Sequence, residues 1–432
     1  MKSGDLSECS NRIALLFFAI YSFIIILNIG GFFTSFYNVN LFYAIVPFSL
    51  ILMVVSIYWG GGFFSSFEIG IFSFFIFIYL GVSISSYFVF SYDPDYDIVY
   101  NLRTLGYSII NVYIYYIATS IFIRLNSLDL LLKILFWIFF IAILTTSLFP
   151  YLGIVPLDYT RASDSLMTLA HSYNIRLTGV YLNPNLTGYV ANIATVFSFF
   201  LFLNMRKNNL AALILFFLSI YVSIRSFSKT SIIITILLVS ISLIFILTKK
   251  EIWIGRNFKW KRILILLTIG LLGISGIKIS DWYGKLDEGQ KDRMEQVFSI
   301  ISEGNLNKKT TTYRSEIWET GIVKIKDSPL FGNGFGTFDY FQEKGQGIHN
   351  MYFKIFGEAG LIIGLVYLIL HFMIIRISFL HHNFRYRYLL IGLTASTLIF
   401  NFSNHNALQT SIISMIYGIL LAFSSSYYAS HK

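Results

Sequence analysis

Arg314 is a residue whose type and position together suggest chemistry. Apolar residues at helical spacing predict a helix from Thr312 to about Lys326, which places Arg314 in its first turn. The free backbone N–H groups of a helix start favour an anion, and a guanidinium adds two parallel donors that suit phosphate. The alternative is an ordinary ion pair with Glu316 or Glu319 on a solvated helix face.

His349 is the residue that could take a proton. It stands immediately before an apolar run, at the predicted boundary between water and membrane. An imidazole with its ordinary pKa near 6.5 can accept a proton from a hydroxyl group at neutral pH. The alternative is a boundary histidine that hydrogen-bonds a lipid headgroup or a loop carbonyl. His405 is a rival proton acceptor in a short polar turn, and Asn350 is predicted to cap the helix that follows it.

Three further cations lie near the ends of apolar runs: Arg176, Arg225 and Lys229. Arg176 precedes Asn183-Pro184-Asn185, which predicts a turn with Asn185 as the cap of the next helix. Arg225 and Lys229 flank a short connection and are separated by about one helical turn. We expect all three to face the aqueous space on the outer side of a membrane, where they could bind a negatively charged group.

An acid and a base lie inside the apolar run after His349, namely Glu358 and Lys354. An ionisable residue inside a membrane span is a candidate functional residue by default. On a straight helix, Glu358 would lie half a turn from the face of His349 and about 13 Å deeper. We therefore expect Glu358 to form a structural ion pair with Lys354, four residues earlier, rather than to act with His349.

The elements that must position these side chains are predicted to be membrane helices. Hydrophobic residues make up 56% of the 432 and charged residues only 12%, whereas a soluble chain is about a quarter charged. Apolar runs of about 20 residues suffice to cross a hydrocarbon core of about 30 Å. The sequence predicts an all-α polytopic membrane protein with about twelve spans. These are about 13–33, 41–58, 68–90, 104–123, 128–149, 186–204, 209–224, 229–248, 262–280, 351–375, 388–402 and 408–426.

Lysine and arginine set the predicted orientation. They gather in alternate loops, such as 249–262 and 376–387, and loops of this kind stay in the cytoplasm. Both termini are then cytoplasmic in a multi-pass protein of the cytoplasmic membrane. Residues 1–280 would form nine spans with an outer loop at about 150–185, and 351–432 the last three. Residues 281–350 would form one long extracytoplasmic loop that contains short helices.

Composition excludes several other classes of function. The single cysteine, Cys9, rules out a disulfide framework or a cysteine zinc site within the chain. A net charge of +10 is explained by basic cytoplasmic loops, so we expect no nucleic-acid partner. The acids between Asp93 and Asp97 are interpreted as a solvated loop rather than a metal site. We expect neither a metal nor a cofactor.

Several motifs resemble the C-terminal signature of the O-antigen ligase and polymerase family. The strongest part runs from 314 to 361, and a weaker similarity extends back to about 170. The matching residues are Arg314, Trp318, Ser328-Pro329-Leu330, Gly332-Asn333-Gly334, Gly336-Thr337, His349-Asn350 and Glu358-Ala359-Gly360-Leu361, with Arg176 to Asn185 and Ser228-Lys229 upstream.

The resemblance implies a function for the residues in these motifs. Members of the O-antigen ligase and polymerase family are integral-membrane glycosyltransferases of the GT-C type that act on polyprenyl-diphosphate-linked glycans. For such a transfer, inversion is expected at the anomeric carbon. The resemblance implies that His349 is the catalytic base, or the residue that orients the acceptor, and that Arg314 binds substrate. Arg176, Arg225 and Lys229 would help to bind the diphosphate. The family often has an arginine where this chain has Lys229, which keeps the charge but loses the bidentate fork.

The expected activity is polymerisation of lipid-linked oligosaccharide repeat units into an O-antigen or capsular polysaccharide on the outer face of the cytoplasmic membrane. The alternative within the family is a ligase that transfers the finished glycan to lipid A–core or another acceptor. A transporter of lipid-linked glycan is the alternative from another class, but its site would be expected near the membrane midplane between repeats, and the sequence has no visible repeat. Membrane lipid, a flippase and a chain-length regulator are the expected partners.

Overall fold

A computed structural model describes most of the chain, and its regular elements there are all helices. The described residues are 3–37, 66–92, 97–154, 176–204, 209–248, 283–284, 286, 288–303, 314–339, 347–404 and 410–429. The chain divides into two compact units. Unit 1 comprises Met1–Leu135, Thr311–His382 and Leu393–Lys432, and unit 2 comprises Phe136–Thr310 and Asn383–Gly392.

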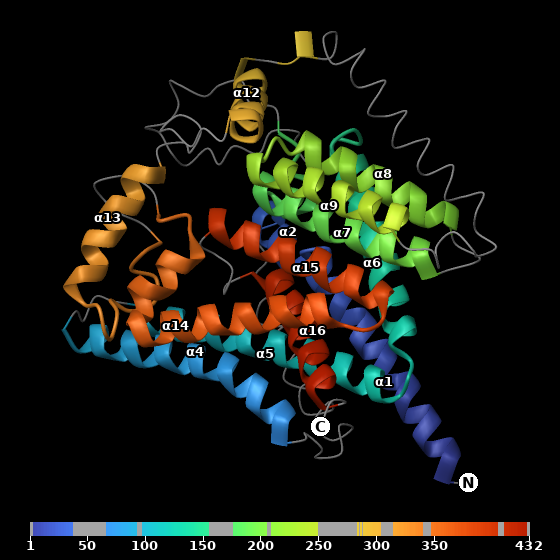
Figure 1. Ribbon diagram of the computed structural model, residues 1–432, viewed down its shortest axis with the longest axis horizontal. Coiled ribbons are helices and arrows are strands. Elements are labelled where there is room, and N and C mark those ends of the chain that lie inside the picture. Colours follow the sequence, from blue (N-terminus) through green and yellow to red (C-terminus); the bar gives the residue numbers. More distant parts are fainter. Residues whose placement is uncertain are drawn as a thin grey trace. The chain divides into compact units, whose positions relative to one another are not determined.

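The helices are labelled in chain order (Figure 1). Those of unit 1 are α1 (Ser3–Ile26), α2 (Ile29–Tyr37), α4 (Ser66–Tyr92), α5 (Ile98–Arg124), α13 (Arg314–Asp327), α14 (Met351–Leu380) and α16 (Ser411–Ala429). Those of unit 2 are the short η1 (Gly179–Tyr181), α7 (Pro184–Asn204), α8 (Asn209–Arg225), α9 (Lys229–Thr248) and α12 (Glu288–Glu303). Residues of both units occur in α6 (Leu128–Leu148) and α15 (Phe384–Ser403).

Several helices have the length and composition of membrane spans. Among the described residues, α5, α6, α7, α9 and α14 are long and apolar enough to cross a membrane. Shorter apolar stretches lie in α1, α4, α8 and α16. The predicted spans 41–58 and 262–280 fall outside the described residues. The regular elements of the described residues are all helices, as predicted, and these five candidate spans are consistent with a polytopic membrane protein, while the number of twelve stays a prediction.

The first predicted span, 13–33, is not one straight helix. The chain leaves α1 after Ile26 and starts α2 at Ile29. Asn28 between them has a φ of +51°, in the left-handed region. Asparagine tolerates that region better than most residues, because its side chain can hydrogen-bond locally. The apolar run alone could not reveal this break.

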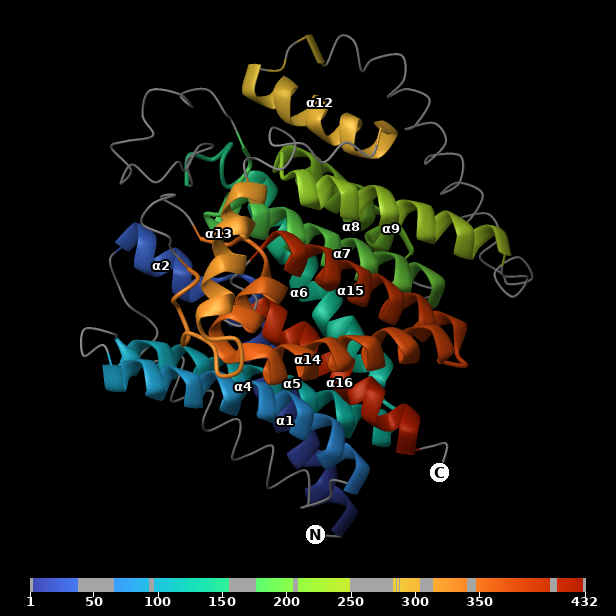
Figure 2. The same cartoon turned by 60° about the vertical axis from the view of Figure 1, so that its left-hand side comes forward.

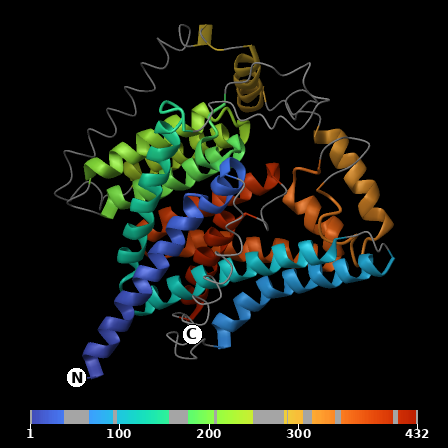
Figure 3. The same ribbon diagram turned by 180° about the vertical axis from the view of Figure 1, so that it is seen from behind.

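Unit 1 is built on helices that approach each other closely through small and polar residues. α16 packs along α5, and a Cβ at Gly418 would lie 2.5 Å from the Val112 carbonyl oxygen. The hydroxyls of Ser108 and Ser414 are 2.7 Å apart across the same pair. Such contacts are typical of helices that associate in an apolar surrounding. α4 lies beside α5, as Figure 3 shows, and also beside α14.

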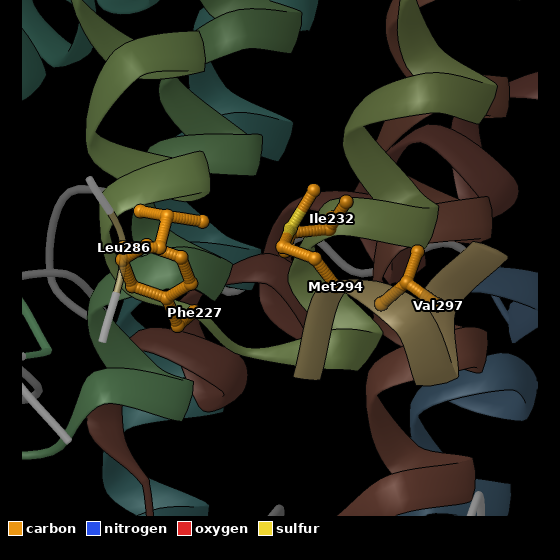
Figure 4. Close-up of a cluster of buried hydrophobic side chains, with 5 residues drawn as sticks. All are labelled: Phe227, Ile232, Leu286, Met294 and Val297. Carbon is orange, nitrogen blue, oxygen red and sulfur yellow. The ribbon is translucent and has the colours of Figure 1, made fainter. Parts of the chain in front are cut away.

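Unit 2 is centred on α7, which packs against α8 and α9. A buried polar network joins the three helices. Asn192 donates to the Ser231 carbonyl (3.0 Å) and accepts from the Thr235 hydroxyl (2.7 Å), which in turn lies 2.7 Å from Ser223. At one end of α9, side chains of α12 pack onto an apolar cluster (Figure 4). Its members are Phe227, Ile232, Leu286, Met294 and Val297.

Candidate active site

The glycine turn after α13 is fastened to α14 by its backbone. We define the glycine turn as Ser328–Phe338. Asn333 N–H donates to the Gly357 carbonyl (2.8 Å), and Gly334 N–H donates to the Glu358 carbonyl (3.0 Å). Leu361 N–H donates in return to the Pro329 carbonyl (2.8 Å). Figure 2 shows α13 beside the start of α14, and this set of bonds closes the connection between them.

Helix α14 is broken at Gly360 by this contact. Gly360 has φ +83° and ψ 177°, and a Cβ there would lie 2.0 Å from the Leu330 carbonyl oxygen. The rings of Tyr352 and His371 are 5.6 Å apart, whereas 19 residues of straight helix would separate them by about 28 Å. The segment before Gly360 therefore folds back along the segment after it. The predicted straight span 351–375 is wrong in this respect, whereas the depth of about 13 Å expected for Glu358, which precedes the break, stays a prediction.

Substituting the glycines of the turn should separate steric from conformational effects. Gly332 and Gly336 have φ of +76° and +87°, so alanine at either is expected to cost about 1–2 kcal/mol of stability through backbone strain alone. A Cβ at Gly332 would also lie 2.4 Å from the Glu358 backbone, while at Gly336 it would meet only the Asn101 side chain at 3.3 Å. We expect Gly332→Ala to lower the thermal unfolding midpoint clearly more than Gly336→Ala. An equal decrease of the unfolding midpoint in the two variants would contradict the close contact between Gly332 and the backbone of Glu358.

Glu358 holds the glycine turn from inside. It is fully buried, and its Oε1 accepts hydrogen bonds from Gly336 N–H (2.8 Å) and Phe338 N–H (3.2 Å). Lys354, also fully buried, places Nζ 3.7 Å from Glu358 Oε1 and forms a second ion pair with Asp339. The same Nζ lies 4.9 Å from the centre of the Phe335 ring. Lys354 and Glu358 are thus the electrostatic link between α14 and the turn.

Lys324 adds a contact to the turn whose strength should depend on pH. Its Nζ donates to the Thr337 carbonyl (2.9 Å), and burial lowers the lysine pKa below 10.5, opposed by Glu358 and Asp327. The unfolded chain then holds this proton more tightly than the folded protein, so stability rises with pH between the lowered pKa and 10.5. Between the lowered pKa and pH 10.5, we expect the difference in thermal unfolding midpoint, wild type minus Lys324→Met, to increase with pH. A constant difference would contradict this expectation.

His349 is held between two fixed points of the backbone. On one side, Ile348 N–H donates to the Phe338 carbonyl (3.1 Å), and its own carbonyl accepts from Trp318 Nε1 (3.0 Å). On the other side, the Asn350 side chain caps α14 by accepting from the N–H groups of Tyr352 (2.9 Å) and Phe353 (3.2 Å). The backbone of His349 has a φ of +45°, and its side chain is half-buried. A non-glycine residue held in this region stores strain, which often marks a functional site.

Arg314 is the first residue of α13, as its predicted position near a helix start requires. It precedes Trp318 by four residues, and positions four apart lie on one face of a helix. Since Trp318 bonds to the residue before His349, the start of α13 belongs to the same part of unit 1 as His349. His405 lies outside the described residues.

Arg176, Arg225 and Lys229 gather at one turn of unit 2. Arg176 Nε donates to the Ser226 carbonyl (2.9 Å), and Leu177 N–H donates to the Arg225 carbonyl (2.9 Å). Lys229 Nζ donates to Gln296 of α12 (2.8 Å). All three cations are half-buried, so a concentration of positive charge is built into the connection between α8 and α9.

The predicted cap at Asn185 is wrong by two residues. Asn183 is the capping residue, and its side chain accepts from the N–H groups of Asn185 (2.9 Å) and Leu186 (3.3 Å). Pro184 occupies the first position of α7, where its missing N–H costs nothing. Asn185 instead accepts a hydrogen bond from the Arg176 guanidinium (3.2 Å), which helps to fix that cation.

Comparison with known families now identifies the domain that contains His349. Residues 214–369 match a family model described as O-antigen ligase. This part of the chain is therefore similar to the O-antigen ligase and polymerase family. Members of this family are glycosyl-transferring enzymes. No curated protein matches the chain.

The O-antigen ligase match covers the glycine turn, α13 and the break in α14, but part of their support comes from outside it. Ser85 and Ser86 of α4 accept hydrogen bonds from the N–H groups of Gly334 and Phe335 (both 3.0 Å). The Ser85 hydroxyl donates to the Glu358 carbonyl (2.6 Å). These serines and Asp339 are not among the residues predicted from the sequence. Adjacent serines within a long apolar run were the available signal, because polar side chains there usually find partners on another helix.

The described residues offer no cluster for a metal. Among them, no three His, Cys, Asp or Glu side chains lie together in a way that could hold an ion. The chemistry that these side chains themselves can provide is proton transfer at His349 and binding of an anion by the arginines and lysine.

Proposed function

We propose that the protein transfers a glycan from a polyprenyl-diphosphate carrier to a sugar hydroxyl, on the outer face of the cytoplasmic membrane. In this reaction the acceptor oxygen attacks the anomeric carbon and the bond from that carbon to the diphosphate oxygen breaks. The proton of the acceptor hydroxyl goes to His349, and the polyprenyl diphosphate leaves with the bonding electrons. The anomeric configuration inverts, because the transfer has a single displacement.

The observation that carries the proposal is the strained and doubly anchored backbone of His349. His349 has a positive φ of +45°, and hydrogen bonds fix the residues on both sides of it. Such anchoring holds an imidazole in place before substrate arrives, and preorganisation of this kind lowers the cost of proton transfer. The position of His349 within the O-antigen ligase match adds to this support.

Positively charged side chains are proposed to bind the diphosphate of the carrier. Arg314 at the start of α13 combines a guanidinium with the free N–H groups of a helix terminus, which favours phosphate. Arg176, Arg225 and Lys229 are proposed to bind the diphosphate as well, and their half-burial strengthens attraction to an anion. These positive charges would stabilise the leaving group without a metal ion.

Polymerisation of lipid-linked repeat units remains our first assignment for the overall reaction. Ligation of the finished glycan to lipid A–core or another acceptor is the second candidate, favoured by the description of the matching family. A flippase and a chain-length regulator are proposed partners for a polymerase. Both termini of the protein are proposed to lie in the cytoplasm.

Complementation of a host that carries the glycan locus of this protein but lacks its gene tests the proposal. Wild type, His349→Asn and Arg314→Lys would be compared by glycan length on a gel, with equal membrane expression verified. A ladder with wild type and single repeats with the variants supports a polymerase. Long chains left on the lipid carrier in the deletion strain indicate a ligase instead. A full ladder with both variants contradicts the assignment of this site.

A further inference from the structure

Three aromatic rings from three helices meet near the start of α14, which follows His349 in the chain. Trp318 of α13 and Phe402 of α15 have ring centres 5.9 Å apart at an angle of 89°. The Phe402 ring also lies 6.0 Å from that of Tyr352 in α14. We call Trp318, Tyr352 and Phe402 the aromatic shelf. All three belong to unit 1 and lie within 314–404 of the described chain.

The shelf is built on the residues that flank His349. Trp318 donates its indole N–H to the carbonyl of Ile348, which fixes the orientation of the ring. Tyr352 has its backbone N–H bonded to the Asn350 side chain. Two members of the shelf are therefore bonded to the chain neighbours of His349, Trp318 through its ring and Tyr352 through its backbone, which ties the shelf to the segment that carries the histidine.

A buried polar cluster supports the shelf from behind. The Tyr352 ring packs against those of Tyr367 (5.7 Å) and His371 (5.6 Å). His371 Nε2 lies 2.8 Å from the Tyr417 hydroxyl, to which Asn401 donates (2.7 Å). These hydrogen bonds join α14, α15 and α16 and limit movement of the helices that carry Tyr352 and Phe402. A rigid set of rings loses little entropy when it binds a ligand.

The front of the shelf is open. Phe402 is 55% exposed, and Trp318 and Tyr352 are half-buried. An aromatic face carries partial negative charge, and it attracts the weakly positive C–H bonds on one face of a pyranose ring. The exposed phenylalanines of α14, such as Phe379, have no comparable connection to His349.

We propose that the aromatic shelf is the binding site for the sugar ring of the acceptor. This inference rests on the proposed function, because a general base must lie within hydrogen-bond reach of the hydroxyl that it deprotonates. The acceptor sugar must therefore sit beside His349, and the shelf is bonded to both chain neighbours of that histidine. Stacking on the rings binds the sugar and turns one hydroxyl towards the imidazole, and the Tyr352 hydroxyl offers a polar contact at the edge.

The test measures binding separately from transfer. Repeat-unit oligosaccharide, released by mild acid from the lipid fraction of the deletion strain, is added to the full-length protein in nanodiscs. Saturation-transfer NMR then reports which sugar protons contact the protein. We expect Trp318→Leu and Phe402→Ala to weaken binding by about three- to tenfold, which is the range for loss of an aromatic contact of about 0.5–1.5 kcal/mol. Phe379→Ala, which removes an exposed ring of α14, is the matched control and should bind as the wild type does.

Kinetics in proteoliposomes separate this inference from the proposed function. Phe402→Ala should raise the apparent KM for the oligosaccharide acceptor and leave kcat near the wild-type value. Trp318→Leu also removes an anchor of the His349 backbone, so it should raise KM and lower kcat together. His349→Asn should lower kcat and retain binding. Phe402→Ala decides the result if Trp318→Leu does not fold. Wild-type binding in a folded Phe402→Ala would overturn the shelf and identify these rings as a lipid contact. Binding on the shelf without any transfer by the wild type would overturn the proposed function but retain the sugar site.

Discussion

His349→Asn is expected to lower the rate of glycan transfer by about 10²- to 10⁴-fold, which is the contribution of a positioned general base. Asparagine is chosen because it tolerates the left-handed backbone that His349 adopts at φ +45°. The variant should therefore keep its thermal unfolding midpoint while losing its proton acceptor. Transfer would be measured in proteoliposomes that contain the lipid-linked repeat unit.

Two further variants distinguish lost chemistry from lost structure. His349→Gly relieves the backbone strain and should also be folded and inactive, and added imidazole should restore part of its rate. His349→Ala retains the strain and should be less stable than His349→Gly by about 1–2 kcal/mol. If His349→Asn keeps the full rate, the proton acceptor is another group, and His405 becomes the first candidate.

Glu358→Ala should have the largest effect on stability, a loss of about 3–5 kcal/mol, as when one partner of a buried ion pair is removed. The substitution leaves the N–H groups of Gly336 and Phe338 without their acceptor. It also leaves the fully buried Lys354 with Asp339 as its ion-pair partner. The measurement is thermal or denaturant unfolding of the purified protein in detergent, followed by the transfer assay.

Glu358→Gln is the matched control for this prediction. A glutamine oxygen can still accept from both N–H groups, so we expect a smaller loss than with alanine. Adding Lys354→Met to Glu358→Ala should recover part of the stability, because it removes a fully buried ammonium that has lost one of its two carboxylate partners. Equal losses for alanine and glutamine would show that the carboxylate does not act by holding the turn.

Local features of the site could be predicted because they depend on neighbours in sequence. Asn350 stands before an apolar run, and the structure has its side chain as the cap of α14. Lys354 and Glu358 are four residues apart on a predicted helix, and their charged groups are 3.7 Å apart. The helix after Thr312 was expected to end near Lys326, and α13 ends at Asp327.

Features that depend on distant partners could not be predicted. Gly360 within an apolar run is compatible with a straight span, and only its contact with the Leu330 carbonyl reveals the break. Asp339 gave no signal, because its partner Lys354 is reached only after the chain has turned back. The Asn185 error had another cause, since Asn183 and Asn185 are both good capping residues and only the place of Pro184 decides between them.

The hydrogen bond from Ile348 to Phe338 has a consequence for how this part of the chain tolerates insertions. Near it, a Cβ at Gly347 would lie 2.2 Å from the Asp339 carbonyl oxygen, so Asp339 and Gly347 are in direct contact. When two ends are fixed in this way, lengthening the sequence between them costs only about 0.6 kcal/mol for each doubling of its length. Residues inserted between Asp339 and Gly347 should therefore leave His349 and the glycine turn in their places.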